Sequence, residues 1–567
     1  MRIAACTAAP LLLIGVLAWP LLFTEEAFNA DWVNHFWFMW HQSLAIRSGH
    51  TPSLFVNYSH GVFYPWFAFY GGTLYALAGA LSLALGNAPL ETYVLTYLLG
   101  FAAAYGGWYW MARMFGLRSW PAHIPGLIFV TSAAYLTILY ALGDWPEFTA
   151  VSAMPLLIAS ALSVLRTSQV TFWPAAALAG SGVVFFGSHL LTEVWGTTLV
   201  LLLALALLAC VPEIRRSLTR ASVARTLGLL IPALLVSAWF LLPALAYESQ
   251  TVIAHTYPHF RELLKAKMFT VAAPHLFTLS RARVSGTILT LALPVLAIAW
   301  ALGSIAVALA ARRRGLWMKV LLALTGATAL LLVLMTHATL ILALPRVYST
   351  LQFSFRLESY VLLGVSGMLL AALVLTGDGG PWLLRWRWLL APIAALAILG
   401  AIEQVDAHTT GSNRAAVLRS FRSPAYAQEA LLDYVDDQLP IMRTPLPKVY
   451  FPPSTAPGEH AVVVTHLGRR RLLDTNLRSA PGFLHIQGAR IVATDAHADD
   501  IVEVDRAPSA GRPVRIVVAT SESLPIAAGR ILSIAALLIL GVELALIALR
   551  RDRTAGTEDP GTIPHRL

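Results

Sequence analysis

The sequence predicts a polytopic α-helical membrane protein of about 12 transmembrane helices, with a small external domain of α+β or β-rich type. Of the 567 residues, 57% are hydrophobic and 12% are charged, whereas soluble domains carry roughly 25% charged residues. Apolar runs of about 20 residues recur along most of the chain, which is the length that an α-helix needs to cross the hydrocarbon core of a bilayer. The solvent of this chain is therefore lipid.

Twelve apolar runs are long enough to span a membrane. They cover residues 4–23, 91–112, 121–142, 147–165, 170–188, 191–211, 226–247, 286–310, 317–342, 358–376, 386–401 and 527–549. We treat a further run, residues 62–85, as re-entrant or interfacial, because six basic loops or ends then fall on one side. These contain Arg113, Arg166, Arg215, Arg312, Arg385 and Arg550. Lys and Arg are enriched in short cytoplasmic loops, so both termini are expected in the cytoplasm.

Composition changes sharply after the eleventh predicted span. Residues 1–401 are expected to form the transmembrane domain, 402–526 an external domain, 527–549 the final span and 550–567 a polar, disordered cytoplasmic tail. In the external region the segments KVYF, HAVVVTHL, ARIVATDA and VRIVVAT predict short strands. The segment PAYAQEALLDYVDDQL predicts one amphipathic helix. The acidic segment DAHADDIVEVD lacks EF-hand spacing and predicts a solvated turn.

Several function classes find no support in the sequence. The net charge of +10 comes from basic loops between spans, so it does not indicate a nucleic-acid partner. The two cysteines, Cys6 and Cys210, fall within or beside predicted spans, which argues against a disulfide framework or a zinc site. We find no Walker loop, no GxGxxG after a strand and no HExxH. No organic cofactor is therefore expected, while a divalent cation stays open.

Ionisable residues within or beside membrane spans are costly and usually functional, and the first external segment contains such a residue. Asp31 stands in FNADWVNHFWFMWHQSLAIRSGH, four residues before His35, so both lie on one face of a short helix. The Trp and Phe residues of this helix suit the headgroup region. The alternative is that Asp31 does no more than N-cap the helix.

Two further external turns carry ionisable pairs. In GDWPEF, the carboxylates of Asp144 and Glu147 could bind a sugar hydroxyl, a metal or a basic partner; alternatively Asp144 only forms the turn and caps the next helix. In GSHLLTEVW, His189 and Glu193 are four residues apart near the external surface. The alternative there is that Ser188 caps the span and the pair hydrogen-bonds locally.

The external turn LPRVYSTLQFSFRLESY contains Arg346, Arg356 and Glu358. A bidentate guanidinium at the outer end of a span suits a lipid phosphate. The alternative is that Arg356 pairs with Glu358 or extends to the headgroups. The basic loop 248–285 could contact anionic headgroups or a donor phosphate, and its histidines are a weak metal signal without a third ligand.

These segments together resemble a known class. The first span with its acidic external loop, then SLAIRSGHTP and GVFYPWFAFYGGTLYALAGAL, and the blocks GDWPEFTAVSAMPLL, GSHLLTEVW and LQFSFRLESY are similar to C-type (GT-C) integral membrane glycosyltransferases. The chain more closely resembles the bacterial membrane proteins grouped as YfhO-like or 6-pyruvoyl-tetrahydropterin synthase-related. The resemblance covers roughly residues 1–400. It implies a polyprenyl-phosphate sugar donor presented from the outer leaflet of the bacterial inner (plasma) membrane.

The same resemblance implies that Asp31 is the general base of an inverting transfer to a hydroxyl of an envelope glycan, lipid or protein. One departure matters, because many relatives carry a paired acidic motif, whereas here Ala30 precedes Asp31 and Trp32 follows it. A second carboxylate would then come from Asp144 or Glu147.

Physical chemistry is consistent with these roles. A carboxylate can accept the proton of an alcohol as the new bond forms. Positive charge stabilises a leaving lipid phosphate, for which Arg356 and Arg346 are candidates. The supporting residues are His35, Asp144, Glu147, His189 and Glu193. Two alternatives remain, a transporter or flippase of lipid-linked glycans and a non-catalytic envelope-assembly scaffold. The transferase is favoured because the polar residues gather at the external ends and no repeated half is found.

Overall fold

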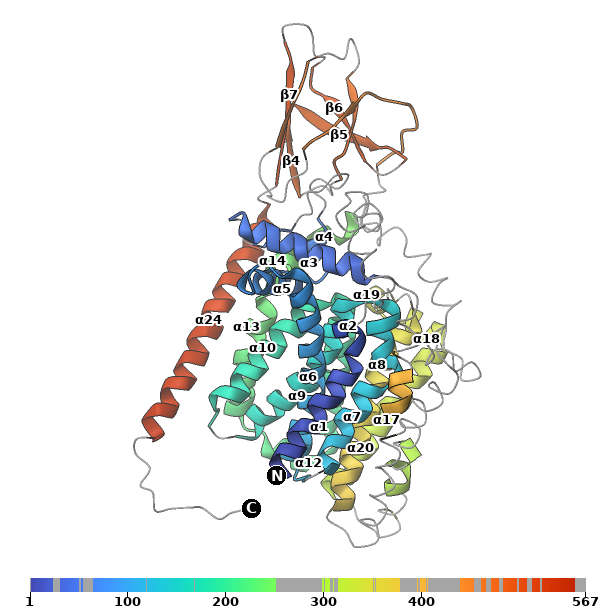
Figure 1. The fold of residues 1–567 in the computed structure, drawn as a ribbon, viewed down its shortest axis with the longest axis vertical. Coiled ribbons are helices and arrows are strands. Elements are labelled where there is room, and N and C mark those ends of the chain that lie inside the picture. The colour runs from blue at the N-terminus through green and yellow to red at the C-terminus, as the bar shows by residue number, and fades with distance from the viewer. Residues whose placement is uncertain are drawn as a thin grey trace.

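The computed structural model describes most of residues 2–250, 315–377 and 439–555, each with short gaps, and a few positions within 298–309 and 395–405. A bundle of steep helices carries a small sheet region at one end (Figure 1). The predicted spans 286–310 and 386–401 lie largely outside the described residues. So do the loop 248–285, the amphipathic helix of the external region and the end of the tail.

The described helices follow the chain in this order. The first group is α1 (Arg2–Leu17), α2 (Trp19–Phe23), α3 (Trp32–Arg47), α4 (Trp66–Phe69), α5 (Gly72–Ala84), α6 (Pro89–Met114), η1 (Trp120–His123), α7 (Ile124–Thr131), α8 (Ala133–Thr137), η2 (Ile138–Leu142) and α9 (Trp145–Arg166). The second group is α10 (Phe172–Ser188), α11 (Leu190–Cys210), α12 (Pro212–Ser217), α13 (Arg220–Leu235), α14 (Ala238–Tyr247) and η3 (Glu248–Gln250). The last group is α17 (Leu316–Thr336), α18 (Ala338–Leu342), α19 (Arg346–Ser349), η5 (Ser354–Leu357), α20 (Glu358–Gly377) and α24 (Leu524–Ala555).

Among the described residues, five helical stretches are long and apolar enough to cross a membrane. They are α9, α11, α17, the η5–α20 stretch Ser354–Leu375, and Leu524–Leu549 of α24. Two bent pairs raise the number to seven, one formed by Trp120–Thr131 with Ala133–Tyr140 and one by α13 with α14. The chain is therefore a membrane protein, and the expected total of about 12 spans stays a prediction.

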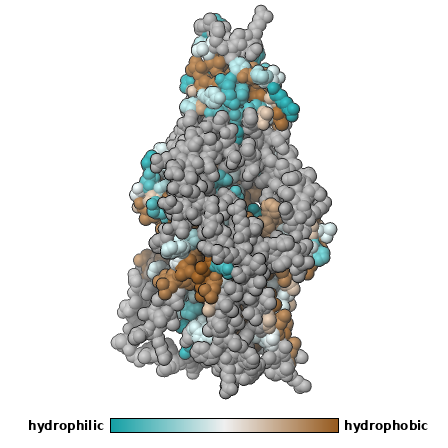
Figure 2. Space-filling view, turned by 45° about the vertical axis from the view of Figure 1, so that its right-hand side comes forward, coloured by the Kyte–Doolittle hydropathy of each residue, from teal (hydrophilic) through white to brown (hydrophobic). Residues whose placement is uncertain are grey.

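Lipid-facing surface is visible on the outer helices. Only 11% of the α11 window and 17% of the α24 window is buried, and large apolar side chains of α24 such as Ile531 and Leu538 are mostly exposed. In Figure 2, hydrophilic and hydrophobic residues are mixed in the sheet region at the top, and a larger hydrophobic patch lies lower, on the bundle. Exposed apolar side chains on a helix that long are stable only against hydrocarbon.

Close helix contacts in the bundle depend on small residues. A Cβ atom on Gly107 of α6 would overlap the backbone of α9 at Pro155 and Leu156, so the two backbones touch at this crossing. Nearer the other end of the pair, the indole of Trp145 donates a hydrogen bond to Thr96 Oγ1 at 2.9 Å. These contacts fix where α9 begins, which is where the acidic turn lies.

Helix α3 lies across the end of the bundle that faces the sheets (Figure 1). It packs against α5 so closely that a Cβ on Gly79 would come within 2.9 Å of the Ser43 backbone nitrogen. The run 62–85 contains the two short helices α4 and α5, separated by Gly71 in the left-handed region at φ 50°. That this run is re-entrant or interfacial stays a prediction.

The sheet region has seven described strands in two sheets. They are β1 (Lys448–Val449), β2 (His460–Val464), β3 (Leu472–Thr475), β4 (Leu484–Gln487), β5 (Ala489–Thr494), β6 (Asp500–Val504) and β7 (Val514–Thr520). The four-stranded sheet has the order β1-β3-β6-β5 and the three-stranded sheet the order β2-β7-β4. All ladders are antiparallel except β1–β3, which is parallel. Phe483 joins the region to the bundle by ring contacts with Phe69 and Tyr247.

One expectation for this region was wrong. The segment DAHADDIVEVD is not a solvated turn throughout, because β6 starts at Asp500 and both Asp499 and Asp500 are buried. Asp499 Oδ1 accepts a hydrogen bond from Arg478 Nε at 2.9 Å, and Lys448 Nζ lies 3.2 Å from Oδ2. A buried charge needs such partners, and they lie at least 21 residues away in the chain, so the local pattern does not reveal them.

Candidate active site

Four of the predicted residues meet at the sheet-facing end of the bundle. Each nitrogen of the Arg356 guanidinium faces a different group. Nη2 lies 3.7 Å from Asp144 Oδ2, Nε lies 3.8 Å from Glu147 Oε2, and Nη1 lies 3.5 Å from His189 Nε2. We call these four residues the arginine cluster. Three separate chain segments therefore contribute to one group.

The acidic pair is positioned by a tight turn. The π-helical turn η2 ends at Gly143, whose φ of 67° is left-handed, and Asp144 Oδ1 then accepts a hydrogen bond from the Glu147 backbone nitrogen at 3.1 Å. Asp144 is therefore the N-cap of α9, as the alternative reading proposed. Its other oxygen faces Arg356, so capping and a role in the site coexist.

His189 occupies the turn between α10 and α11. The backbone nitrogen of Thr192 donates to His189 Nδ1 at 3.4 Å, and the Thr192 hydroxyl lies 2.7 Å from the same atom. His189, and not Ser188, is thus the N-cap of α11. The alternative of a local bond between His189 and Glu193 is also wrong, because the side-chain partner of His189 within this turn is Thr192. Glu193 is half-buried, and its Oε2 has no hydrogen-bond partner among the described residues.

The protonated nitrogen of His189 depends on which of its contacts is made. With the proton on Nδ1, the ring donates to the Thr192 hydroxyl at 2.7 Å, and Arg356 Nη1 donates to Nε2 at 3.5 Å. With the proton on Nε2, Nδ1 accepts from the Thr192 backbone N–H at 3.4 Å. Both arrangements keep the His189 ring beside the guanidinium.

Arg356 reaches the cluster from η5, one turn before α20. Tyr360 of α20 anchors this segment, because its hydroxyl donates to the Thr192 carbonyl at 3.0 Å. The Arg356 side chain retains 18% exposure, so it can be reached from outside. The alternative pairing of Arg356 with Glu358 is wrong, since the ion pairs of Arg356 go to Asp144 and Glu147. Glu358 is buried, and its Oε1 has no hydrogen-bond partner in the described part of the chain.

Asp31 lies beside the cluster. Its backbone nitrogen donates to the Leu142 carbonyl at 3.1 Å, which ties it to the turn that precedes Asp144. Its carboxylate is exposed and interacts electrostatically with Arg356. The side chain makes no capping hydrogen bond to the first turn of α3. The alternative that Asp31 is only an N-cap is therefore wrong.

His35 lies one turn after Asp31 on α3 and is buried. Its Nδ1 is 2.7 Å from the Tyr75 hydroxyl, and its ring stacks on Tyr70 at 5.5 Å between centroids. Tyr70 in turn makes an edge contact with His189. His35 Nε2 has no hydrogen-bond partner among the described residues. The Tyr70 ring contacts both His35 and His189, so it connects the helix that follows Asp31 to the arginine cluster.

Burial and charge set the ionisation of the groups at the helix ends. Burial lowers the pKa of His35 and of His189 to about 4, against a smaller opposing effect of Asp144. Burial alone would raise the pKa of Asp144, but His189, Arg356 and His35 together hold it below its usual value. At neutral pH the two histidines are uncharged, so the guanidinium supplies the positive charge that keeps Asp144 ionised.

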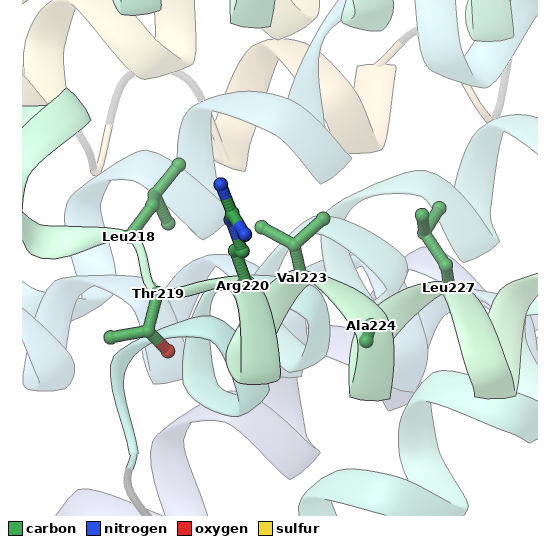
Figure 3. Close-up of a pocket in the computed structure, with 6 residues that line it drawn as sticks. All are labelled: Leu218, Thr219, Arg220, Val223, Ala224 and Leu227. Carbon is green, nitrogen blue, oxygen red and sulfur yellow. The ribbon is translucent and has the colours of Figure 1, made fainter.

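The described contacts of α19, the helix that begins at Arg346, do not place Arg346 in the arginine cluster. It is exposed at the start of α19, and Tyr348 of that helix bonds to Thr198 of α11 at 2.8 Å. Thr198 lies more than two turns along α11 from His189. An open hollow also lies elsewhere, along the first two turns of α13, and is lined by Leu218, Thr219, Arg220, Val223, Ala224 and Leu227 (Figure 3).

Sequence reasoning missed several side chains that shape the site. Tyr70, Tyr75 and Tyr360 contact the histidines or anchor the arginine segment, and none was singled out. The aromatic content of residues 62–70 was a signal that this segment lies at an interface. The partners of the individual rings depend on how α3, α5 and α11 pack, which local sequence does not contain.

The chain matches no family model and no curated protein. Similar solved structures include the mycobacterial arabinofuranosyltransferase AftD, at 17% identity and a TM-score of 0.44 over 72% of this chain. This chain spans only 27% of that protein. ArnT from Cupriavidus metallidurans, bound to undecaprenyl phosphate, shares 12% identity at a TM-score of 0.40, covering 78% of this chain and 82% of ArnT.

An oligosaccharyltransferase from Archaeoglobus fulgidus shares 13% identity at a TM-score of 0.46, covering 79% of this chain and 62% of the archaeal protein. With TM-scores below 0.5 and identities below 20%, these likenesses do not by themselves establish a shared activity. The arginine cluster with Asp31 beside it is the feature from which a function can be argued.

Proposed function

We propose that this chain is a GT-C-type membrane glycosyltransferase that transfers a sugar from a polyprenyl-phosphate donor to a hydroxyl of an envelope glycan, lipid or protein. The single observation that carries the proposal is the partly exposed Arg356 guanidinium, held by Asp144, Glu147 and His189 beside the exposed carboxylate of Asp31. A guanidinium suits a phosphate, and a carboxylate beside it suits an incoming alcohol.

In the proposed reaction Asp31 is the general base. The acceptor oxygen forms a bond to the anomeric carbon of the sugar while its proton passes to the Asp31 carboxylate. The bond between that carbon and the phosphate oxygen breaks, and the polyprenyl phosphate leaves with the electron pair. Because attack and departure occur on opposite faces, the anomeric configuration inverts. Asp31 is the only group in this scheme that takes up a proton.

Arg356 stabilises the leaving phosphate in this proposal. A guanidinium has five N–H donors, and three of them are directed at the Asp144, Glu147 and His189 side chains. One N–H on each of Nη1 and Nη2 remains, and this fork matches two phosphate oxygens. The contacts of 3.5–3.8 Å exceed ordinary hydrogen-bond lengths of about 2.7–3.2 Å. The guanidinium is therefore held by charge and can turn toward the phosphate.

The positions of the charged residues favour this function over transport. Asp144 and His189 are N-caps, and Arg356 precedes α20, so the cluster lies at helix ends. Transporters place their ionisable residues near the bilayer midplane. A scaffold would not need a partly exposed guanidinium next to an exposed base. Under the proposal this end of the bundle and residues 402–526 are external, and both termini are cytoplasmic in the bacterial plasma membrane.

The finer roles belong to the same proposal. His35 and Glu193 support or contact substrate, and the chain belongs to the YfhO-like subgroup. Arg346 as a second phosphate ligand stays a prediction, because the described contacts of α19 do not bring it to the arginine cluster. Undecaprenyl phosphate is the lipid that the Cupriavidus structure holds, and it has the chemistry of the leaving group proposed here.

Transfer of radiolabelled sugar from polyprenyl-phosphate donors by the purified chain tests the proposal. Asp31→Asn removes the base, so we expect transfer to fall by roughly 10²–10⁴-fold with an unchanged melting temperature. Glu91→Gln is the matched control, because Glu91 is an exposed carboxylate in the first turn of α6. If Asp31→Asn transfers sugar as fast as the control, Asp31 is not the base.

A further inference from the structure

We propose that the Arg356 guanidinium is the resident cation of this site and takes the place that a divalent metal ion would otherwise occupy. The ligand-type atoms of Asp144, Glu147 and His189 lie within 4.8 Å of one another, and a carboxylate–carboxylate–imidazole set suits divalent cations. The inference about metal exclusion stands on this geometry. Its consequence for sugar transfer rests on the proposed function.

The guanidinium contacts all three of these groups. Its three nitrogens are each paired with one of them, at 3.5, 3.7 and 3.8 Å. A metal ion would need one ligand atom of each group at about 2.0–2.6 Å, so it would lie close to the guanidinium. The positive charge of the guanidinium would repel it.

The charge balance is consistent with a built-in cation. One guanidinium offsets the Asp144 carboxylate, and its interaction with Asp31 extends the same positive charge to the proposed base. Because Arg356 is part of the chain, in η5, its positive charge is present in every molecule and does not have to be bound from solution. It also leaves two N–H donors for the phosphate, so it supplies the electrostatic stabilisation that a metal ion supplies elsewhere.

Mn²⁺ binding to the full chain in lipid nanodiscs, after stripping with EDTA, tests the inference. We expect less than about 0.1 Mn²⁺ per wild-type chain at 0.1 mM metal, by elemental analysis and electron paramagnetic resonance, and transfer within about twofold with and without EDTA. Arg356→Gln removes the charge, so we expect about one Mn²⁺ per chain. Adding Asp144→Asn to that variant should abolish the binding.

Two further variants control the comparison. Arg118→Gln removes an exposed arginine between α6 and η1 and should leave Mn²⁺ unbound, as in the wild type. Arg356→Lys keeps a positive charge and should also exclude Mn²⁺, which separates charge from folding defects. The inference is overturned if the wild type binds one Mn²⁺ that Asp144→Asn removes, or if Arg356→Gln folds and still excludes Mn²⁺. If no variant transfers sugar, the proposed function fails while the metal measurement still decides this inference.

Discussion

Two buried ionic groups in this chain differ in the length of their contacts. In the sheet region, Arg478 Nε is 2.9 Å from Asp499 Oδ1, and both side chains are almost fully buried. In the arginine cluster, Arg356 lies 3.7 Å from Asp144 and 3.8 Å from Glu147. The first group has the length of a charge-assisted hydrogen bond. The second is too long for any ordinary hydrogen bond.

The difference in contact length indicates that the Arg478–Asp499 pair stabilises the fold, whereas the arginine cluster is a binding site. A buried ion pair is stable only when its hydrogen bonds are made, and the pair in the sheet region makes the short bond between Arg478 Nε and Asp499 Oδ1. The Arg356 and Glu147 side chains instead face each other with Nε and Oε2 buried and without hydrogen-bond partners among the described residues. Such atoms carry a cost that a bound ligand can remove. The looser group is therefore the one prepared for substrate.

Arg478→Ala should give the largest effect on stability. It leaves Asp499 buried with one strong partner removed, and breaking a buried pair costs about 3–5 kcal/mol. We expect a lower melting temperature and faster proteolysis within residues 439–520, measured on the full chain in detergent. Transfer per folded molecule should stay near the wild-type value, because Arg478 lies in the sheet region.

Arg443→Ala is the control for that measurement, since Arg443 is an exposed arginine of the same region and should shift the melting temperature little. Equal stability of the Arg478 and Arg443 variants would show that the short ion pair contributes nothing to the sheet region. The Arg478–Asp499 pair could then no longer be contrasted with the arginine cluster as a group that stabilises the fold.

Arg356→Gln should give the opposite pattern. Removing a preorganised donor from a transition state typically lowers the rate by about 10²–10³-fold, so we expect that loss in sugar transfer. Stability should change less than in Arg478→Ala, because long contacts of a partly exposed side chain are weak. Transfer assays and thermal unfolding on the same preparation check both expectations. A variant that unfolds as readily as Arg478→Ala would mean that the cluster is structural.

Gly71→Ala should weaken the turn that supports His189. The φ of 50° at Gly71 is left-handed, and an added Cβ would overlap the Ser188 carbonyl oxygen next to His189. We expect a loss of about 1–3 kcal/mol in stability and lower transfer. Gly86→Ala is the matched control, because its φ of 81° is also left-handed but no atom lies within 4 Å of the added Cβ. Similar transfer by both variants would show that Ser188 yields without moving His189.

Much of the fold follows from composition and local pattern. Apolar length alone identified the regions that became α9, α11, α17, α20 and α24, because a span must be continuous and apolar. Alternating β-branched residues identified four strands. The strands β3, β4 and β6 were missed, since they are four or five residues long and contain charged or polar residues. Their strand character comes from pairing with neighbours.

The site divides in the same way. The sequence identified Asp144, Glu147, His189 and Arg356 individually, because an ionisable residue at the end of a span is energetically costly and therefore usually functional. Their meeting could not be read from the sequence, since Arg356 is 167 residues from His189. Local rules also chose the wrong partners, as with Glu358 for Arg356 and Glu193 for His189. Packing of separate helices decides such pairs.

The pH dependence of stability offers the most specific test of the site. His35 has a pKa of about 4 in the folded chain because of burial and about 6.5 when unfolded. Between these values the unfolded state binds the extra proton, so the contribution of His35 to stability falls as pH drops from 6.5 to 4 by about 1.4 kcal/mol per pH unit. Burial also lowers the pKa of His41 and of His189 to about 4, so these histidines add to the wild-type slope. His35→Gln should reduce the slope by the contribution of His35, measured as the difference from wild type in thermal unfolding at each pH, whereas His337→Gln, at an exposed histidine, should keep the wild-type slope. A wild-type slope in His35→Gln would mean that the His35 ring is hydrated in solution and is not part of the buried site.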